Sequence, residues 1–198
     1  MRHRSLAREE AIEEYLIYRK RMRELLDKAQ IARDIKAHTY KPTDFSGQGP
    51  ERFAEVVGRV LVGLFADLLD PQNHALNAFD VWVVLFPQKV NTINQVWDKV
   101  KGHVQLIRDY RNDVACHANK GLRRYVNTIV KFQDARDQIL QAMQSVTELA
   151  AELMREEAAS LPNLRHDVDP IIRKYFANLD FEQTECLKDY FLQAGPGA

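Results

Sequence analysis

An arginine and a histidine stand six residues apart in the stretch RDYRNDVACHANK, which spans residues 108 to 120. Arg111 brings a permanently charged, planar group that can hold two phosphate oxygens at once. His117 brings an imidazole whose ordinary pKa of about 6.5 suits proton transfer near neutral pH. Together these two residue types suit a reaction at a phosphate group.

Arg111 falls on the apolar face of the helix that this segment predicts. With about 100 degrees between successive residues, Val104, Val114 and Ala118 all lie within about 60 degrees of it. Burying an unpaired arginine costs several kcal/mol, so its presence there requires a reason. The structural alternative is an ion pair with a carboxylate on a neighbouring helix, or a side chain that extends along its stem to solvent.

His117 lies about 9 Å farther along the helix axis and about 120 degrees around it. In one straight helix the two side chains would lie on different faces. They can converge because arginine is long, because the helix ends between Ala118 and Gly121, or because a second subunit brings its own copy. A histidine near a helix end can also act only as a cap.

The stretch from Arg111 to His117 resembles the signature of the HEPN superfamily, helical-bundle proteins in which four to six residues separate the arginine from the histidine. A polar residue, commonly asparagine, follows the arginine in this family. Here the spacer has five residues and Asn112 is that polar residue. Cys116 departs from the usual alanine, and Ala115 replaces the tyrosine of one subgroup. The likeness extends from the first helix to about residue 158 and is greatest with abortive-infection members.

The resemblance implies that the chain cuts RNA without a metal ion or other cofactor. A ribose 2′-hydroxyl attacks the neighbouring phosphate and leaves a cyclic phosphate and a 5′-hydroxyl. His117 would transfer protons and Arg111 would stabilise the phosphorane. Asn112 and Asp113 would support them. One chain supplies one such histidine, so a homodimer with a composite cleft is expected. A toxin or phage-defence role, restrained by an antitoxin protein, is also implied, as is the alternative of a non-catalytic RNA- or protein-binding member.

Basic residues gather around the motif although the formal charge of the whole chain is zero. Residues 99–131 contain eight basic and two acidic residues, a local charge of plus six. The candidate RNA-binding residues are Arg108, Lys120, Arg123, Arg124 and Tyr125, whose ring could stack on a base. The alternative is that the basic residues after the motif form only the solvated start of a helix.

The composition is that of a globular protein. The chain has 198 residues, 45% hydrophobic and 28% charged, which is enough for one core. Its two cysteines and six histidines show no metal-ligand spacing, so no metal site is expected. The N-terminus lacks the apolar segment of a signal peptide, and no apolar run reaches the roughly 18 residues of a membrane span. A cytoplasmic protein is therefore expected.

Apolar periodicity predicts an all-α fold, an antiparallel bundle of four to five main helices with short C-terminal helices. The run VWVVLF could be scored as a strand, but no second strand-like segment is present for pairing, so a buried helix is expected. The predicted helices cover residues 5–36, 50–69, 75–86, 91–119, 122–158 with a kink near 134, 170–177 and 181–192.

The expected domain organisation has two parts. Residues 1–160 form the HEPN-like bundle, and residues 161–198 form a C-terminal helical extension packed on the same domain. Loops are expected at residues 37–50 and between Pro162 and Pro170, since proline and glycine interrupt helices.

Overall fold

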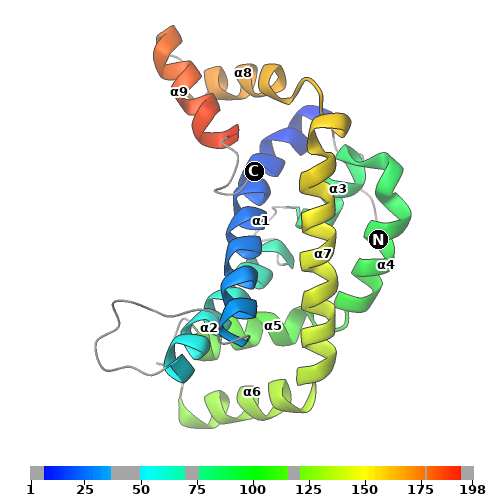
Figure 1. The fold of residues 1–198 in the computed structure, drawn as a ribbon, viewed down its shortest axis with the longest axis vertical. Coiled ribbons are helices and arrows are strands. Elements are labelled where there is room, and N and C mark those ends of the chain that lie inside the picture. Colours follow the sequence, from blue (N-terminus) through cyan, green and yellow to red (C-terminus); the bar gives the residue numbers. More distant parts are fainter. Residues whose placement is uncertain (1–6, 37–49, 70–75, 116–120, 177, 193–198) are drawn as a thin grey trace.

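A computed structural model describes residues 7–36, 50–69, 76–115, 121–176 and 178–192 of the chain. These residues form helices and no strand, which confirms the predicted all-α class. Four helices run along the long axis of the molecule in alternating directions (Figure 1). They are α1 (Arg8–Lys36), α2 (Pro50–Leu69), α4 (Val90–Val100) and α7 (Arg136–Ser160).

The core lies where these helices enclose the short helix α3 (Ala78–Leu85). Its side chains Phe79 and Trp82 are fully buried, and so is Tyr15 of α1. The N-terminus of α3 is capped by Asn77, whose Oδ1 accepts the backbone N–H of Asp80 at 3.0 Å. The VWVVLF run is thus helical up to Leu85, as predicted, and burial on nearly all sides explains its continuous apolar character.

The helix predicted over residues 91–119 is wrong as a single element, because it breaks at residues 101–103. After the short 3-10 turn η1 (Pro87–Lys89), α4 packs on α7, while the next helix, α5 (Val104–Tyr110), packs on α2. One straight helix could not contact both neighbours. Gly102 lies within the break, where its low helix propensity weakens the continuation. The turn η2 (Arg111–Ala115) then follows α5.

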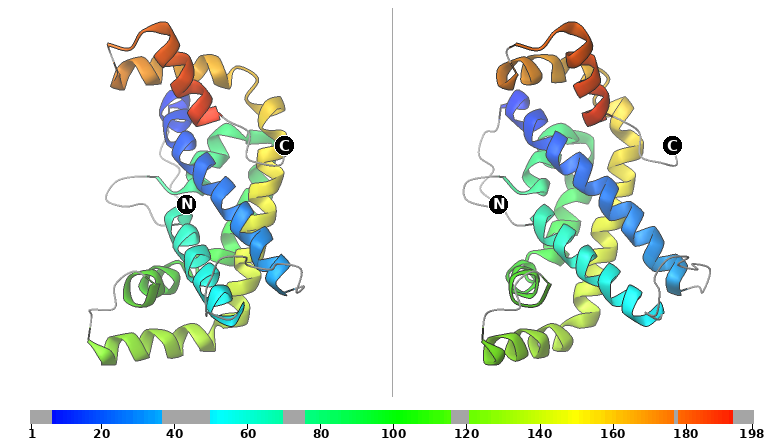
Figure 2. Two further views of the ribbon diagram at one scale, coloured as in Figure 1. Left: turned by 60° about the vertical axis from the view of Figure 1, so that its left-hand side comes forward. Right: turned by 90° about the vertical axis from the view of Figure 1, so that its left-hand side faces the viewer.

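The helix predicted over residues 122–158 also divides in two. Where a kink was expected near residue 134, Ala135 leaves the helical conformation and separates α6 (Leu122–Asp134) from α7. Figures 1 and 2 show α6 lying across one end of the bundle. It is anchored there by Phe132, whose ring lies 4.1 Å from that of Tyr110 on α5.

Two helices, α8 (Leu164–Tyr175) and α9 (Phe181–Leu192), cover the opposite end of the bundle (Figure 2). The bounds of α9 match the prediction. The loop expected between Pro162 and Pro170 is wrong, because α8 begins at Leu164 and includes Pro170. Burial of Leu164 and Val168 against the bundle compensates for the hydrogen bond that the proline cannot make.

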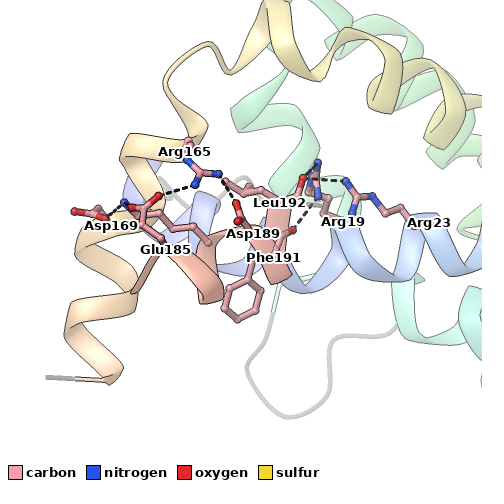
Figure 3. Close-up of polar contacts among 9 residues, drawn as sticks. Arg19, Arg23, Arg165, Asp169, Glu185, Asp189, Phe191 and Leu192 are labelled. Carbon is pink, nitrogen blue, oxygen red and sulfur yellow. Dashed lines mark hydrogen bonds and ion pairs between the residues drawn. The ribbon is translucent and has the colours of Figure 1, made fainter. Parts of the chain in front are cut away.

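Polar contacts hold α9 in place, as Figure 3 shows. Arg19 of α1 donates to the carbonyl oxygens of Phe191 at 2.8 Å and Leu192 at 3.2 Å. The same guanidinium pairs with Glu157 of α7 at 2.5 Å and 2.7 Å. One buried arginine thereby joins three helices. None of the helices within the described ranges combines the length and the apolar character that crossing a membrane requires.

Candidate functional site

The arginine of the motif opens a single π-helical turn, η2. Such turns are rare and occur frequently at functional sites. A π-helical turn contains more residues than an α-helical turn, so the side chains after Arg111 leave the progression of about 100 degrees that the sequence analysis assumed. Arg111 contacts α2, whereas Asp113, two residues later and on the opposite side of the turn, contacts α6.

Arg111 forms an ion pair at the edge of the bundle. Its Nη1 donates to Oδ1 of Asp67 at 3.0 Å, and its Nε donates to Oδ1 of Asn112 at 3.1 Å. The Arg111 side chain is 13% exposed and that of Asp67 is 31% exposed. A carboxylate on a neighbouring helix therefore accounts for the arginine on the apolar face, which is the structural arrangement that the sequence left open.

Asp67 is shared between two arginines. Arg21 of α1 places Nη2 at 3.6 Å from Oδ2 of Asp67, and it also pairs with Glu24 at 3.0 Å. These contacts connect α1 through α2 to the π-helical turn. Ion pairs as exposed as those of Arg21 contribute little stability, so the contact of Asp67 with Arg111 is the more important of the two.

Asp113 anchors the same turn on its other side. Its side chain is 1% exposed, and its Oδ2 accepts from Nε of Arg124 at 2.8 Å and from Oγ1 of Thr128 at 3.1 Å. Both donors belong to α6. The hydrogen bond and the charge of Asp113 raise the pKa of Arg124 above its ordinary value. The π-helical turn is consequently held by α2 at Arg111 and by α6 at Asp113.

A cleft of about 760 Å³ opens between α5 and α6 beside Asp113. Three cations and two carboxylates line it together with smaller polar and apolar groups. The lining residues are Leu106, Asp109, Asp113, Gly121, Leu122, Arg123, Arg124, Asn127, Thr128 and Lys131. Arginine and lysine at the wall of an open cleft are suited to bind an anion such as a phosphodiester.

The structure brings only some of the predicted site residues together. Arg123 and Arg124 line the cleft, and so does Asp113. Arg111 and Asn112 contact each other on the side of the turn that faces α2.

The remaining predicted residues lie elsewhere or are not described. Arg108 and Tyr125 are half-buried and do not line the cleft. His117 and Lys120 lie outside the described residues, as does Cys116.

Sequence reasoning missed the partners that other helices contribute. Asp67 is the one acidic residue in the apolar stretch LVGLFADLL, and an acid in such a position could have been suspected as a partner for Arg111. Thr128 and Lys131 carry no comparable signal. Their role depends on how α6 turns across the end of the bundle, which local periodicity does not determine.

Among the described residues, no group of three or more histidine, cysteine, aspartate or glutamate side chains could hold a metal ion. Comparison of the chain with protein-family models, with curated proteins and with solved structures gave no match. Functional inference therefore rests on the motif and on the geometry around it.

Proposed function

We propose that the protein is a HEPN-type, metal-independent endoribonuclease that acts in the cytoplasm as a toxin or phage-defence effector. The observation that carries this proposal is the position of Arg111. It opens a π-helical turn, and its guanidinium is held by Asp67 and Asn112 at a partly exposed site. A cleft lined by cations lies on the other side of the same turn.

In the proposed reaction, the 2′-hydroxyl of one ribose attacks the adjacent phosphate, and the 5′-oxygen of the next nucleotide leaves. Arg111 stabilises the negative charge that builds on the phosphorane oxygens. His117 transfers the proton that moves between the attacking and leaving oxygens. Asn112 orients the guanidinium by accepting from its Nε. Arg123, Arg124 and Lys131 hold the RNA backbone in the cleft.

The proposal includes a homodimer. In-line transfer works best with a base at the attacking oxygen and an acid at the leaving oxygen, whereas each chain supplies one motif histidine. A twofold contact would present each motif twice. Arg108, Lys120 and Tyr125 are proposed to contact RNA in that assembly, and an antitoxin protein is proposed to restrain it.

The ion pair between Arg111 and Asp67 favours a second candidate function. An arginine that serves only to join two helices needs a partner of this kind. In that case the chain is a non-catalytic helical module that binds RNA or protein, or an antitoxin-like partner, and the basic cleft is a docking surface.

Substitution of the histidine separates the two functions. His117→Ala should abolish cleavage of single-stranded RNA and toxicity in cells while helix content and melting temperature stay unchanged. Cys116→Ala, at the neighbouring position, is the matched control and should retain cleavage. Cleavage by the unaltered chain should persist in EDTA. Cleavage that survives His117→Ala would contradict the proton-transfer role of His117, and a wild-type chain that binds RNA without cutting it would favour the non-catalytic module.

A further inference from the structure

Arg124 has the geometry of a side chain that is oriented by the protein and directed toward a ligand. Its Nε is bound to Asp113, which is almost fully buried, whereas the Arg124 side chain is 56% exposed. Within the described part of the chain, its Nη1 and Nη2 make no hydrogen bond or ion pair, although the charge of Asp109 also acts on the guanidinium. Arg124 also lines the cleft between α5 and α6. Asp113 therefore holds the guanidinium through Nε, while Nη1 and Nη2 remain available to a ligand.

The carboxylate that holds Arg124 is itself fixed. Thr128, one turn farther along α6, donates to the same Oδ2 of Asp113 at 3.1 Å. Asp113 belongs to the π-helical turn that Arg111 opens, two residues earlier. The same turn therefore carries Arg111 and the carboxylate that holds Arg124.

We propose that Arg124 is the phosphate-binding residue of the cleft, with Asp113 as the residue that positions it. The ligand is a phosphodiester of single-stranded RNA other than the one that is cut. An arginine held at Nε can present both terminal nitrogens to two phosphate oxygens, which a lysine cannot do. This inference rests on the proposed function, since it names a second contact for the same RNA.

The proposal assigns different roles to the two carboxylates of the cleft. Asp109 is half-buried on α5 and accepts from Gln105 at 3.0 Å, on its own helix. Removing its charge should strengthen the binding of a polyanion. Removing the charge of Asp113 should weaken binding instead, because Arg124 then loses its orientation. Simple electrostatics predicts the same sign for both changes, so the opposite signs are diagnostic.

The test uses the full chain and a fluorescent single-stranded RNA in which every ribose carries a 2′-O-methyl group, so that the probe cannot be cleaved. Dissociation constants are measured by anisotropy over a range of salt concentrations. Asp113→Asn should weaken binding by about tenfold, the loss expected for a well-oriented charged hydrogen bond. Asp109→Asn should strengthen it by about threefold, which is typical of one partly exposed charge.

Substitutions of the arginine keep the test decisive if Asp113→Asn fails to fold. Arg124→Lys keeps the charge but loses the bond through Nε, and it should weaken binding nearly as much as Arg124→Ala. Arg124→Ala, which also removes the charge, should lower the slope of log affinity against log salt by about 0.7, the value for one lost contact to a single strand. Arg136→Lys, at an exposed arginine of α7 that does not line the cleft, is the matched control and should bind within about twofold of the wild type.

The results distinguish this inference from the proposed function. If Arg124→Lys binds the probe as tightly as the wild type, or if Asp113→Asn binds more tightly, the positioning role is overturned whether or not the chain cuts RNA. If the predicted binding pattern appears but unmodified RNA is never cleaved, the phosphate site stands and the ribonuclease proposal fails. A chain that does not bind the probe overturns the inference.

Discussion

Two arginines at opposite ends of the bundle differ in how many of their nitrogens donate hydrogen bonds to the protein. Arg19 is 5% exposed and donates through all three nitrogens, to Glu157 and to the last carbonyls of α9. Arg124 is more than half exposed and donates to Asp113 through Nε. A guanidinium has five N–H donors, so one that is saturated by protein can only hold helices together, whereas one with an open edge can hold a ligand.

Arg111 lies between these two cases. It donates through Nε and Nη1, as a structural arginine does, but its partner Asp67 is partly exposed and also contacts Arg21. Burial alone therefore does not reveal the role of an arginine. The hydrogen-bond partners of an arginine, and how exposed those partners are, are the better guide.

The largest effect on stability is expected from Arg19→Ala. This change leaves Glu157 at the junction of α1 and α7 without its cationic partner and releases the end of α9. The free energy of unfolding should fall by about 3 to 5 kcal/mol, as for other broken buried pairs. Urea denaturation followed by circular dichroism measures it. Arg21→Ala, an exposed arginine on the same helix, is the control and should cost about 1 kcal/mol or less. Equal losses of unfolding free energy for Arg19→Ala and Arg21→Ala would contradict the structural role of the buried Arg19.

Arg111→Ala should act on activity far more than on stability. Cleavage of single-stranded RNA should fall by about 100- to 1000-fold, the usual effect of removing a group that stabilises transition-state charge. The free energy of unfolding should fall by only about 1 kcal/mol, because the pair with Asp67 is partly exposed. Single-turnover kinetics and urea denaturation give the two values. A loss of stability like that of Arg19→Ala, with cleavage retained, would make Arg111 structural.

Acid should loosen the C-terminal helices before it unfolds the core of the bundle. Hydrogen bonds from Lys188 are the main cause that lowers the pKa values of Asp169 on α8 and Glu185 on α9, while a hydrogen bond from Tyr175 lowers that of Glu13 on α1. A carboxyl group whose folded pKa is depressed stabilises the fold above its unfolded pKa, about 4, and this contribution disappears as pH falls through the folded pKa.

Amide hydrogen exchange, corrected for its intrinsic dependence on pH, should therefore show that residues 164–192 lose protection below pH 4, before the core helix α7 does. Raising the salt concentration to about 1 M should also reduce the protection of α8 and α9, since it screens exposed ion pairs. Simultaneous loss of protection along the whole chain would show that α8 and α9 are not held by these contacts.

The smallest effect is expected from Thr128→Val, which removes one hydrogen bond to Asp113 while keeping the shape of the side chain. The free energy of unfolding should fall by about 1 kcal/mol, because Asp113 keeps its bond to Arg124. Thr147→Val is the control, since Thr147 bonds only to a carbonyl of its own helix and should cost less. A control variant less stable than Thr128→Val would remove Thr128 from the anchor of the turn.

Local patterns predicted most of the helices, because apolar periodicity reports directly which face of a helix is buried. The second helix begins at Pro50 and α9 covers residues 181–192, as the sequence indicated. The break at residues 101–103 was not located, and the break at Ala135 was predicted only as a kink near residue 134, since each depends on which neighbour the next helix contacts. Pro170 was predicted to end a loop, but burial of the residues around it outweighs the cost of placing a proline inside a helix.

The candidate site was only partly predictable. Arg111 was identified as a charge on an apolar face, and an ion pair with a carboxylate on a neighbouring helix was one of the explanations considered for it. Which carboxylate it uses did not follow, because Asp67 is 44 residues away in sequence. The π-helical turn was not foreseen, because the sequence analysis assumed α-helical spacing throughout this segment.

The chemistry of the RNA ends gives the most direct test of the ribonuclease proposal. Wild-type protein in EDTA is incubated with single-stranded RNA, and the termini of the products are identified by mass spectrometry. Attack by a ribose 2′-hydroxyl predicts fragments that end in a 2′,3′-cyclic phosphate and begin with a 5′-hydroxyl. RNA that stays intact under these conditions, or fragments that carry a 5′-phosphate and a 3′-hydroxyl, would contradict it.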